Sequence, residues 1–153
     1  MKLLLKSAFC AILTLCSCVI LAQETVPLAE PDYNKPKLFA AFPPSIDVQL
    51  QSLENLLPLS EGSAVRFALG SYFFQGSVVS KSDPADKHVQ SVVIKSTNFI
   101  GAAFTFTKII TGDGSVLYRG RIISLAHSDA FELGGQNGQY MFTKKHQLKI
   151  MNE

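Results

Sequence analysis

The chain has 153 residues, with 14 basic and 12 acidic side chains, three cysteines and no tryptophan. Lys2 and Lys6 lie in an N-terminal segment that we expect to be removed, so the mature domain would carry equal numbers of basic and acidic residues. This balance, with no run of like charge beyond Lys144-Lys145, lacks the electrostatic footprint of nucleic-acid or anionic-lipid binding, and we predict no nucleic-acid partner.

Residues 1–22 are typical of an export signal peptide. Two lysines form its positive start, and Ala8–Leu21 is its apolar run. Ile20 and Ala22 occupy the −3 and −1 places of a cleavage site before Gln23. We predict cleavage after Ala22 and a location outside the cytoplasm, either secreted or periplasmic.

Two alternatives to simple cleavage concern the same segment. A transmembrane anchor is disfavoured, because the apolar run is short for a span of about 20 residues and no charged stop-transfer cluster follows it. Leu15-Cys16-Ser17-Cys18 partly resembles the box before the acylated cysteine of bacterial lipoproteins, although Cys16 fits that box poorly. A lipid anchor at Cys18, and thus a membrane-tethered lipoprotein, is therefore the alternative localisation.

All three cysteines (Cys10, Cys16 and Cys18) lie inside the signal. The mature chain would have no disulfide, no thiolate nucleophile and no cysteine-ligated metal. It would have to fold by packing alone, which a chain of about 130 residues can do because it buries well over half of its surface.

Residues 23–44 follow as a proline-rich extended arm or linker, before a single β-rich domain over residues 45–153. Prolines lack an amide donor and bias the preceding residue toward extended backbone. Phe39 and Phe42 would be unfavourable in water, so we expect this part of the arm to dock on the domain.

Ser45–Leu57 is predicted as the one helix. Ser45 can cap its first turn, and Pro58 ends it. Apolar residues recur along one helical face, which we expect to pack on a sheet. These residues are Ile46, Leu50, Leu53 and Leu57.

From Ser63 onward, alternation of apolar and polar residues predicts strands. The runs begin at Val65, Tyr72, Val89, Ala102, Val116, Ala130 and Gln139. Gly70 and Gly76 interrupt the first runs as bulges or bends. Thr111–Ser115 and Gly134–Gly138 are hairpin turns. The expected fold is mainly β (α+β): an antiparallel sheet or partial barrel of about six to seven strands, with one N-terminal helix packed on it.

The histidines are scattered singly, and no motif assembles a nucleophile, a base and an orienting group. We therefore predict a protein that is not an enzyme, with no catalytic, cofactor or metal site. His127-Ser128-Asp129 is the only close pairing of a histidine and a carboxylate. We favour a surface turn there, and the alternative is a small secreted hydrolase using His127 and Asp129.

A polar loop between two strands carries Asp83, Asp86 and His88. Two carboxylates and an imidazole without further ligands make a poor cation site, so we expect a solvated loop. Likewise, Asp113 is explained by its hairpin turn.

The aromatic residues suggest one binding surface and one alternative function. Tyr72, Phe73 and Phe74 are consecutive, so they cannot share one face of a strand. Either both faces of the sheet are covered or an apolar patch is exposed, which makes these three residues our candidate partner surface. The alternative is an apolar-ligand carrier with an interior lined by Phe67, Phe104 and Phe106.

Phe74–Val78, Ser91–Ile94 and Tyr118–Ile122 resemble segments of the β-rich propeptides of secreted zinc metalloproteases. The resemblance implies a free-standing, propeptide-like protease inhibitor, although the inhibitory cysteine common in those propeptides is missing. It supplies no site residues. Our leading prediction is an exported, non-enzymatic binding or scaffolding domain, whose partner is a protein or an apolar ligand outside the cytoplasm.

Overall fold

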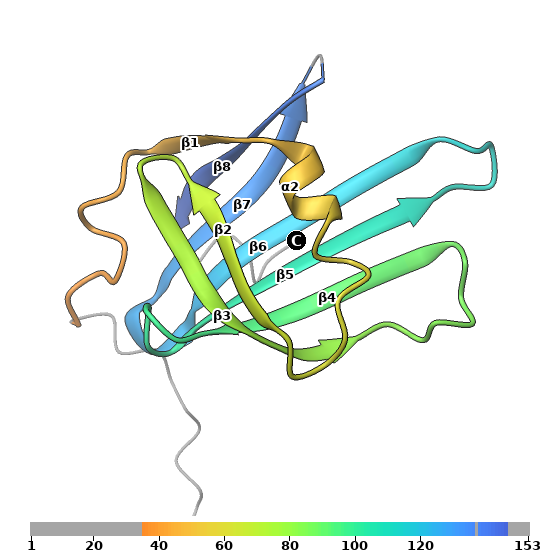
Figure 1. Cartoon of the computed structure of the whole chain (residues 1–153). Helices are drawn as coiled ribbons and strands as arrows, with labels where there is room; N and C mark the ends of the chain where they lie inside the picture. Colours follow the sequence, from red (N-terminus) through yellow and green to blue (C-terminus); the bar gives the residue numbers. More distant parts are fainter. Residues whose placement is uncertain (1–34, 137, 147–153) are drawn as a thin grey trace, which may run out of the picture. The chain divides into compact units, whose positions relative to one another are not determined.

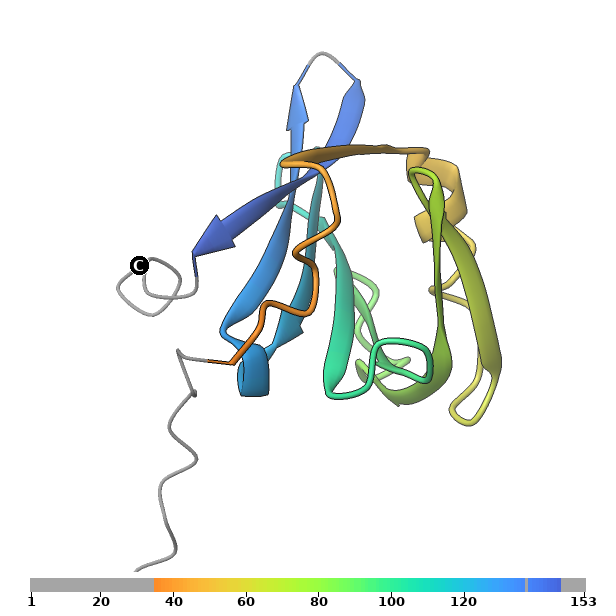
Figure 2. The same ribbon diagram turned by 90° about the vertical axis from the view of Figure 1, so that its left-hand side faces the viewer.

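The computed structural model describes residues 35–136 and 138–146 of the chain. Within this part, eight strands form one antiparallel sheet in the order β1-β8-β7-β6-β5-β4-β3-β2, and the sheet curls into a half-barrel (Figures 1 and 2). The strands are β1 (Ser45–Val48), β2 (Ala64–Leu69), β3 (Tyr72–Lys81), β4 (Val89–Ser96), β5 (Ala102–Ile110), β6 (Val116–Ser124), β7 (Asp129–Gln136) and β8 (Gln139–His146). The predicted mainly β, antiparallel fold is confirmed, with one strand more than the expected six to seven.

Period-two alternation divides the side chains between an inner, concave face and an outer face. In β2, Val65, Phe67 and Leu69 are buried, whereas the residues between them are exposed. In β5, Phe104 and Phe106 point inward and the threonines between and after them point outward. Because successive strands are joined by short connections, the sequence order of β2 to β8 is also their order in the sheet.

The predicted helix over Ser45–Leu57 is wrong in its first part. Ser45–Val48 forms β1, which pairs with β8 from Ser45↔Thr143 to Val48↔Tyr140. Within Ser45–Leu57, only the five residues of α2 (Leu50–Glu54) are α-helical. The free edge of β8 offers backbone hydrogen bonds that a helix start cannot match, and the apolar residues meet the core in either conformation.

The predicted apolar face of this segment is correct only in part. Ile46 and Leu53 are buried, Leu50 and Leu57 are half-buried, and Leu56 is buried although helical spacing did not select it. β1 also brings the two edges of the curled sheet together. Gly70, in the β2–β3 turn with φ of +62°, lies so close to β1 that a Cβ there would be 3.0 Å from Cγ2 of Ile46.

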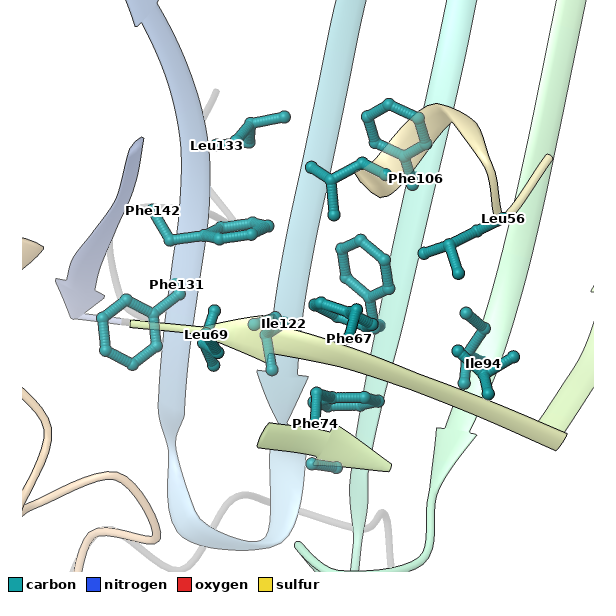
Figure 3. Packing of buried hydrophobic residues seen from close by; sticks show 14 of the residues in the cluster. Leu56, Phe67, Leu69, Phe74, Ile94, Phe106, Ile122, Phe131, Leu133 and Phe142 are labelled. Carbon is teal, nitrogen blue, oxygen red and sulfur yellow. The ribbon is translucent and has the colours of Figure 1, made fainter. Parts of the chain in front are cut away.

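Phenylalanine rings fill the inner face. The ring centroid of Phe104 lies 4.9 Å from that of Phe67, and 5.9 Å from those of Phe74 and Phe142. Figure 3 shows the side chains of Phe67, Phe74 and Phe142 directed into the same interior from different strands. The predicted lining of an apolar-ligand carrier is thus packed against other aromatic rings. Its residues are Phe67, Phe104 and Phe106.

The arm before β1 docks on the sheet, as predicted for Phe39 and Phe42, and both rings are buried. The Phe39 N–H donates to Oδ2 of buried Asp129 (2.6 Å), and Nζ of Lys144 donates to the carbonyl oxygen of Phe39 (2.6 Å). These contacts satisfy backbone groups that would otherwise be buried without partners. The arm's first part, residues 23–34, lies outside the described residues.

The predicted turn over Thr111–Ser115 is confirmed as the β5–β6 connection. The second predicted turn is shorter than expected, because β7 continues through Gly134 and Gly135 to Gln136. Gly76 is not a bend: it lies inside β3, where the backbone carbonyl of Lys95 leaves no room for a Cβ. The irregularity in β3 occurs further along, between Val78 and Ser80.

Candidate functional site

The three aromatic residues predicted as a partner surface do not share one surface. Phe74 is fully buried in the core. Tyr72 stacks on Phe42 with 4.0 Å between ring centroids, and its hydroxyl donates to the carbonyl oxygen of Ala41 (3.1 Å). Phe73 alone is substantially exposed, and the guanidinium of Arg66 lies over its ring at 4.1 Å. Of these three residues, only Phe73 could contact a partner, and the Arg66 guanidinium covers part of its ring.

His127 and Asp129 have different partners in the described part of the chain. Nδ1 of His127 forms a hydrogen bond with Oγ of Ser124 (2.8 Å), a serine with no exposed surface. The Asp129 carboxylate accepts the backbone N–H of Phe39. A catalytic relay needs the carboxylate on the imidazole and an accessible nucleophile. The Asp129 contact instead fastens the arm to the corner between β6 and β7, which holds the short η2 helix (Leu125–His127), and the bond between His127 and Ser124 lies within that corner.

The carboxylates of the β3–β4 loop shape that loop. Oδ1 of Asp83 accepts the N–H of Ala85, and Oδ1 of Asp86 accepts the N–H groups of His88 and Val89. In the described residues, no three histidine, aspartate or glutamate side chains gather as metal ligands would. Asp113 is similarly local: hydrogen bonds from the hydroxyls of Ser115 and Thr111 hold the pKa of its carboxyl well below the ordinary value.

A polar cluster that the sequence did not reveal lies between α2 and the sheet. Oε1 of Glu54 accepts hydrogen bonds from Nζ of Lys108 (2.8 Å) and from the Tyr118 hydroxyl (2.7 Å). The hydrogen bond from Lys108 is the main cause that lowers the pKa of Glu54, and it likewise raises the pKa of Lys108. Burial, followed by the bond to Glu54, raises the pKa of the Tyr118 hydroxyl.

This cluster borders a pocket of about 310 Å³ between α2 and the β3–β4 loop. Its lining has as many basic as acidic side chains. They are Lys81, Lys87 and Lys108 against Glu54, Asp83 and Asp86. Because the Glu54–Lys108 ion pair and the loop hydrogen bonds already engage most of these charges, the pocket has little unbalanced charge to select a ligand.

Glu54→Gln should reduce the free energy of unfolding at neutral pH by up to about 1 kcal/mol, as expected for a partly exposed ion pair. The pKa of Glu54 is lower in the folded state than its ordinary value of 4.5, so its stabilisation is present above that value. It is lost as the pH falls through the folded-state pKa. Urea unfolding between pH 7 and pH 3 should show the difference from wild type shrinking as the pH falls.

Glu61→Gln is the matched control, because Glu61 is exposed in the turn before β2. It should leave stability almost unchanged at every pH. A Glu54→Gln effect that stays constant with pH would contradict the ion-pair explanation.

A hollow of about 640 Å³ lies on the outer face, across β5, β6 and β7. Outward side chains form most of its lining: Thr105, Thr107, Arg119, Arg121, Ile123 and Glu132, with Gly120 and Leu133 at its base. Thr105 is the cross-strand partner of Arg121, and Thr107 is that of Arg119. The two pairs place two hydroxyl groups next to two guanidinium groups on the outer face of the sheet.

The hollow exists because β6 and β7 diverge. They are paired only from Ser124↔Asp129 to Arg121↔Glu132, and beyond this point β7 turns away from β6 (Figure 1). Gly120 lies where they separate, and a Cβ there would be 3.0 Å from the Cβ of Leu133. Because Gly120 has no side chain, Leu133 can pack beneath the point where β6 and β7 separate. The outer surface above this point stays open.

The two arginines of the hollow differ in their contacts. Nε and Nη2 of Arg121 both donate to Oε1 of Glu132, at 3.2 and 3.0 Å. Arg119 is exposed, and within residues 35–136 and 138–146 no side chain forms an ion pair with it. The hollow therefore offers one unneutralised guanidinium, a second that is held by a single carboxylate, and the Thr105 hydroxyl.

Sequence reasoning missed this group because a strand pattern around Arg119 and Arg121 does not show which side chains of the neighbouring strand lie beside them. The signal that could have found it is the Thr-x-Thr pattern of one hairpin strand opposite the Arg-x-Arg pattern of the next. Their alignment depends on the register across Thr111–Ser115, which the structure supplies.

Neither a family model, nor a curated protein, nor a solved structure matches this chain. In the part of the chain that the structure describes, no helix has the length and apolar character needed to cross a membrane. The same part contains no cysteine and hence no disulfide.

Proposed function

We propose that this protein is an exported, non-enzymatic binding domain that recognises a partner outside the cytoplasm through the outer face of its sheet. The observation that carries this proposal is the Arg119 guanidinium, which stands exposed and unpaired among the described residues in a hollow of about 640 Å³. An exposed arginine in a concave surface is a typical anchor for recognition.

The packing of the interior supports an outer binding surface over an apolar-ligand carrier. Phe104 and Phe106 have no exposed surface, and their rings contact each other and their neighbours. A carrier would have to displace these rings to admit a ligand. The engagement of His127 by buried Ser124 likewise argues against the hydrolase alternative.

A propeptide-like protease inhibitor would be one domain of the proposed kind, with a protease as the partner. The segments behind that resemblance lie in β3, β4 and β6, and the third includes Arg119 and Arg121. The hollow is thus the surface that we would test first in that narrower version as well.

A photo-crosslinking amino acid at position 105, in the full chain expressed in its own host, tests the proposal. Thr105 lines the hollow, so irradiation should join the exported protein to a partner. Gln51, exposed on α2, is the control position and should give no such adduct. Identical adducts at both positions, or none at position 105, would contradict recognition through the hollow. Ester, peptide or glycoside hydrolysis that His127→Ala abolishes without unfolding would contradict the non-enzymatic part.

A further inference from the structure

We propose that the hollow binds an extended, acidic segment of a partner protein, with carboxylates at alternate positions of that segment pairing with Arg119 and Arg121. This inference rests on the proposed binding function and names the chemistry of its partner. It is carried by the spacing, the charge and the apolar surroundings of the two arginines.

The spacing follows from strand geometry. Arg119 and Arg121 are two residues apart on one face of β6, which separates their Cα atoms by about 6.5–7 Å. An extended peptide repeats its side chains on one face at the same interval. A segment with acidic residues at i and i+2 could therefore place one carboxylate on each guanidinium, and guanidinium groups bind carboxylates with two parallel hydrogen bonds.

The charge of the outer face favours an acidic ligand. Outward basic residues outnumber outward acidic ones in the described strands: Arg66, Lys95, Arg119, Arg121 and Lys145 against Asp47 and Glu132. Glu132 is engaged by Arg121. Since the mature chain is balanced overall, this face is a local excess of positive charge, and it would attract a negatively charged segment.

The surroundings favour a peptide over a sulfated sugar or a nucleic acid. Ile123 and Leu133 line the hollow beside the arginines, and Ile109 and Leu117 form the cross-strand pair next to Thr107 and Arg119. Arginine is enriched in protein interfaces, from which lysine is depleted. A surface for a long polyanion needs more basic side chains in a row, and Glu132 would oppose it.

The Arg121–Glu132 pair also sets the affinity. In the free protein the Arg121 guanidinium donates two hydrogen bonds to the Glu132 carboxylate. An incoming carboxylate must therefore compete with Glu132 for Arg121. Removing the charge of Glu132 should therefore strengthen binding. A misfolded variant would not produce such a gain.

The test uses the exported protein, purified from cells that produce the full chain, and a fluorescent octapeptide of alternating glutamate and valine. Fluorescence anisotropy should detect binding that weakens with added salt, and the same peptide with glutamine for glutamate should bind far less. Arg119→Ala should weaken binding roughly tenfold, the loss expected for one charge-assisted pair. Glu132→Gln should strengthen it. Arg66→Ala, which changes an outer-face arginine that lies over Phe73, is the matched control and should change it little.

Equal binding by wild type and Arg119→Ala, with both folded by thermal unfolding, would overturn the inference. So would binding of a sulfated oligosaccharide that depends on Arg119 when the acidic peptide does not bind. A crosslink from position 105 without peptide binding would still support the proposed function and would contradict only the inference of an acidic segment. Absence of both would remove both proposals.

Discussion

Phe104→Ala should lower the free energy of unfolding by about 3–5 kcal/mol, the range for removing a buried phenylalanine ring. Phe104 has no exposed surface and lies at the centre of the ring cluster, near Phe67, Phe74 and Phe142. Two contributions add up: the lost free energy of burying the ring, and the free-energy cost of the cavity that the truncation leaves. The cavity persists because the strand backbones are held by hydrogen bonds to neighbouring strands on both sides and cannot collapse into it. Urea unfolding followed by circular dichroism would measure the change.

Phe73→Ala is the control for this substitution. Phe73 neighbours Phe74 in β3 but points outward, and 47% of its surface is exposed. Its removal should cost far less than that of Phe104, mainly the contact with Arg66. Similar losses for the two variants would mean that the inner face is not the packed side of the sheet.

Leu53→Ala should cost about 2–5 kcal/mol, even though α2 is only five residues long. Leu53 is 1% exposed, and it is the buried residue of α2. A helix this short is not stable by itself, so its position depends on the packing of Leu53 and the nearby Leu56. It also depends on the hydrogen bonds that Glu54 accepts from Lys108 and Tyr118. Thermal and urea unfolding should both show the loss.

Leu50→Ala and Gln51→Ala complete the series on the same helix. Leu50 is only half-buried, so its truncation should cost clearly less than that of Leu53, and Gln51 is exposed and should matter little. A continuous helix over Ser45–Leu57 would place Leu50 and Leu53 on one buried face and make their losses similar. Equal measured losses would therefore favour the longer helix over the β1–α2 arrangement.

The packed inner face of the sheet bears on where the protein could bind a partner. Among the described residues, phenylalanine rings fill much of the inner face of the half-barrel, and α2 and the arm add to this core. In the function that we propose, recognition falls to the outer face of the sheet. Outer-face positions alternate with core positions in every strand, so they can change without disturbing the packing.

The sequence by itself determined seven of the eight strands, the Thr111–Ser115 hairpin turn and the docking of Phe39 and Phe42. The strands and the turn depend on local backbone preferences and on the alternation of apolar residues, which are visible in a single strand, whereas the docking follows from the cost of exposing two phenylalanine rings to water. Tertiary structure alone decided that Ser45–Val48 is a strand, because Ile46 and Leu53 can reach the core by either period and the free edge of β8 selects the strand. It also decided where Asp129 and Arg119 act: the first binds the arm 90 residues away, and the second stands in a hollow made by the divergence of β6 and β7. The first contact joins residues far apart in the chain, and the second position depends on how three consecutive strands align and diverge, which the pattern of a single strand does not reveal.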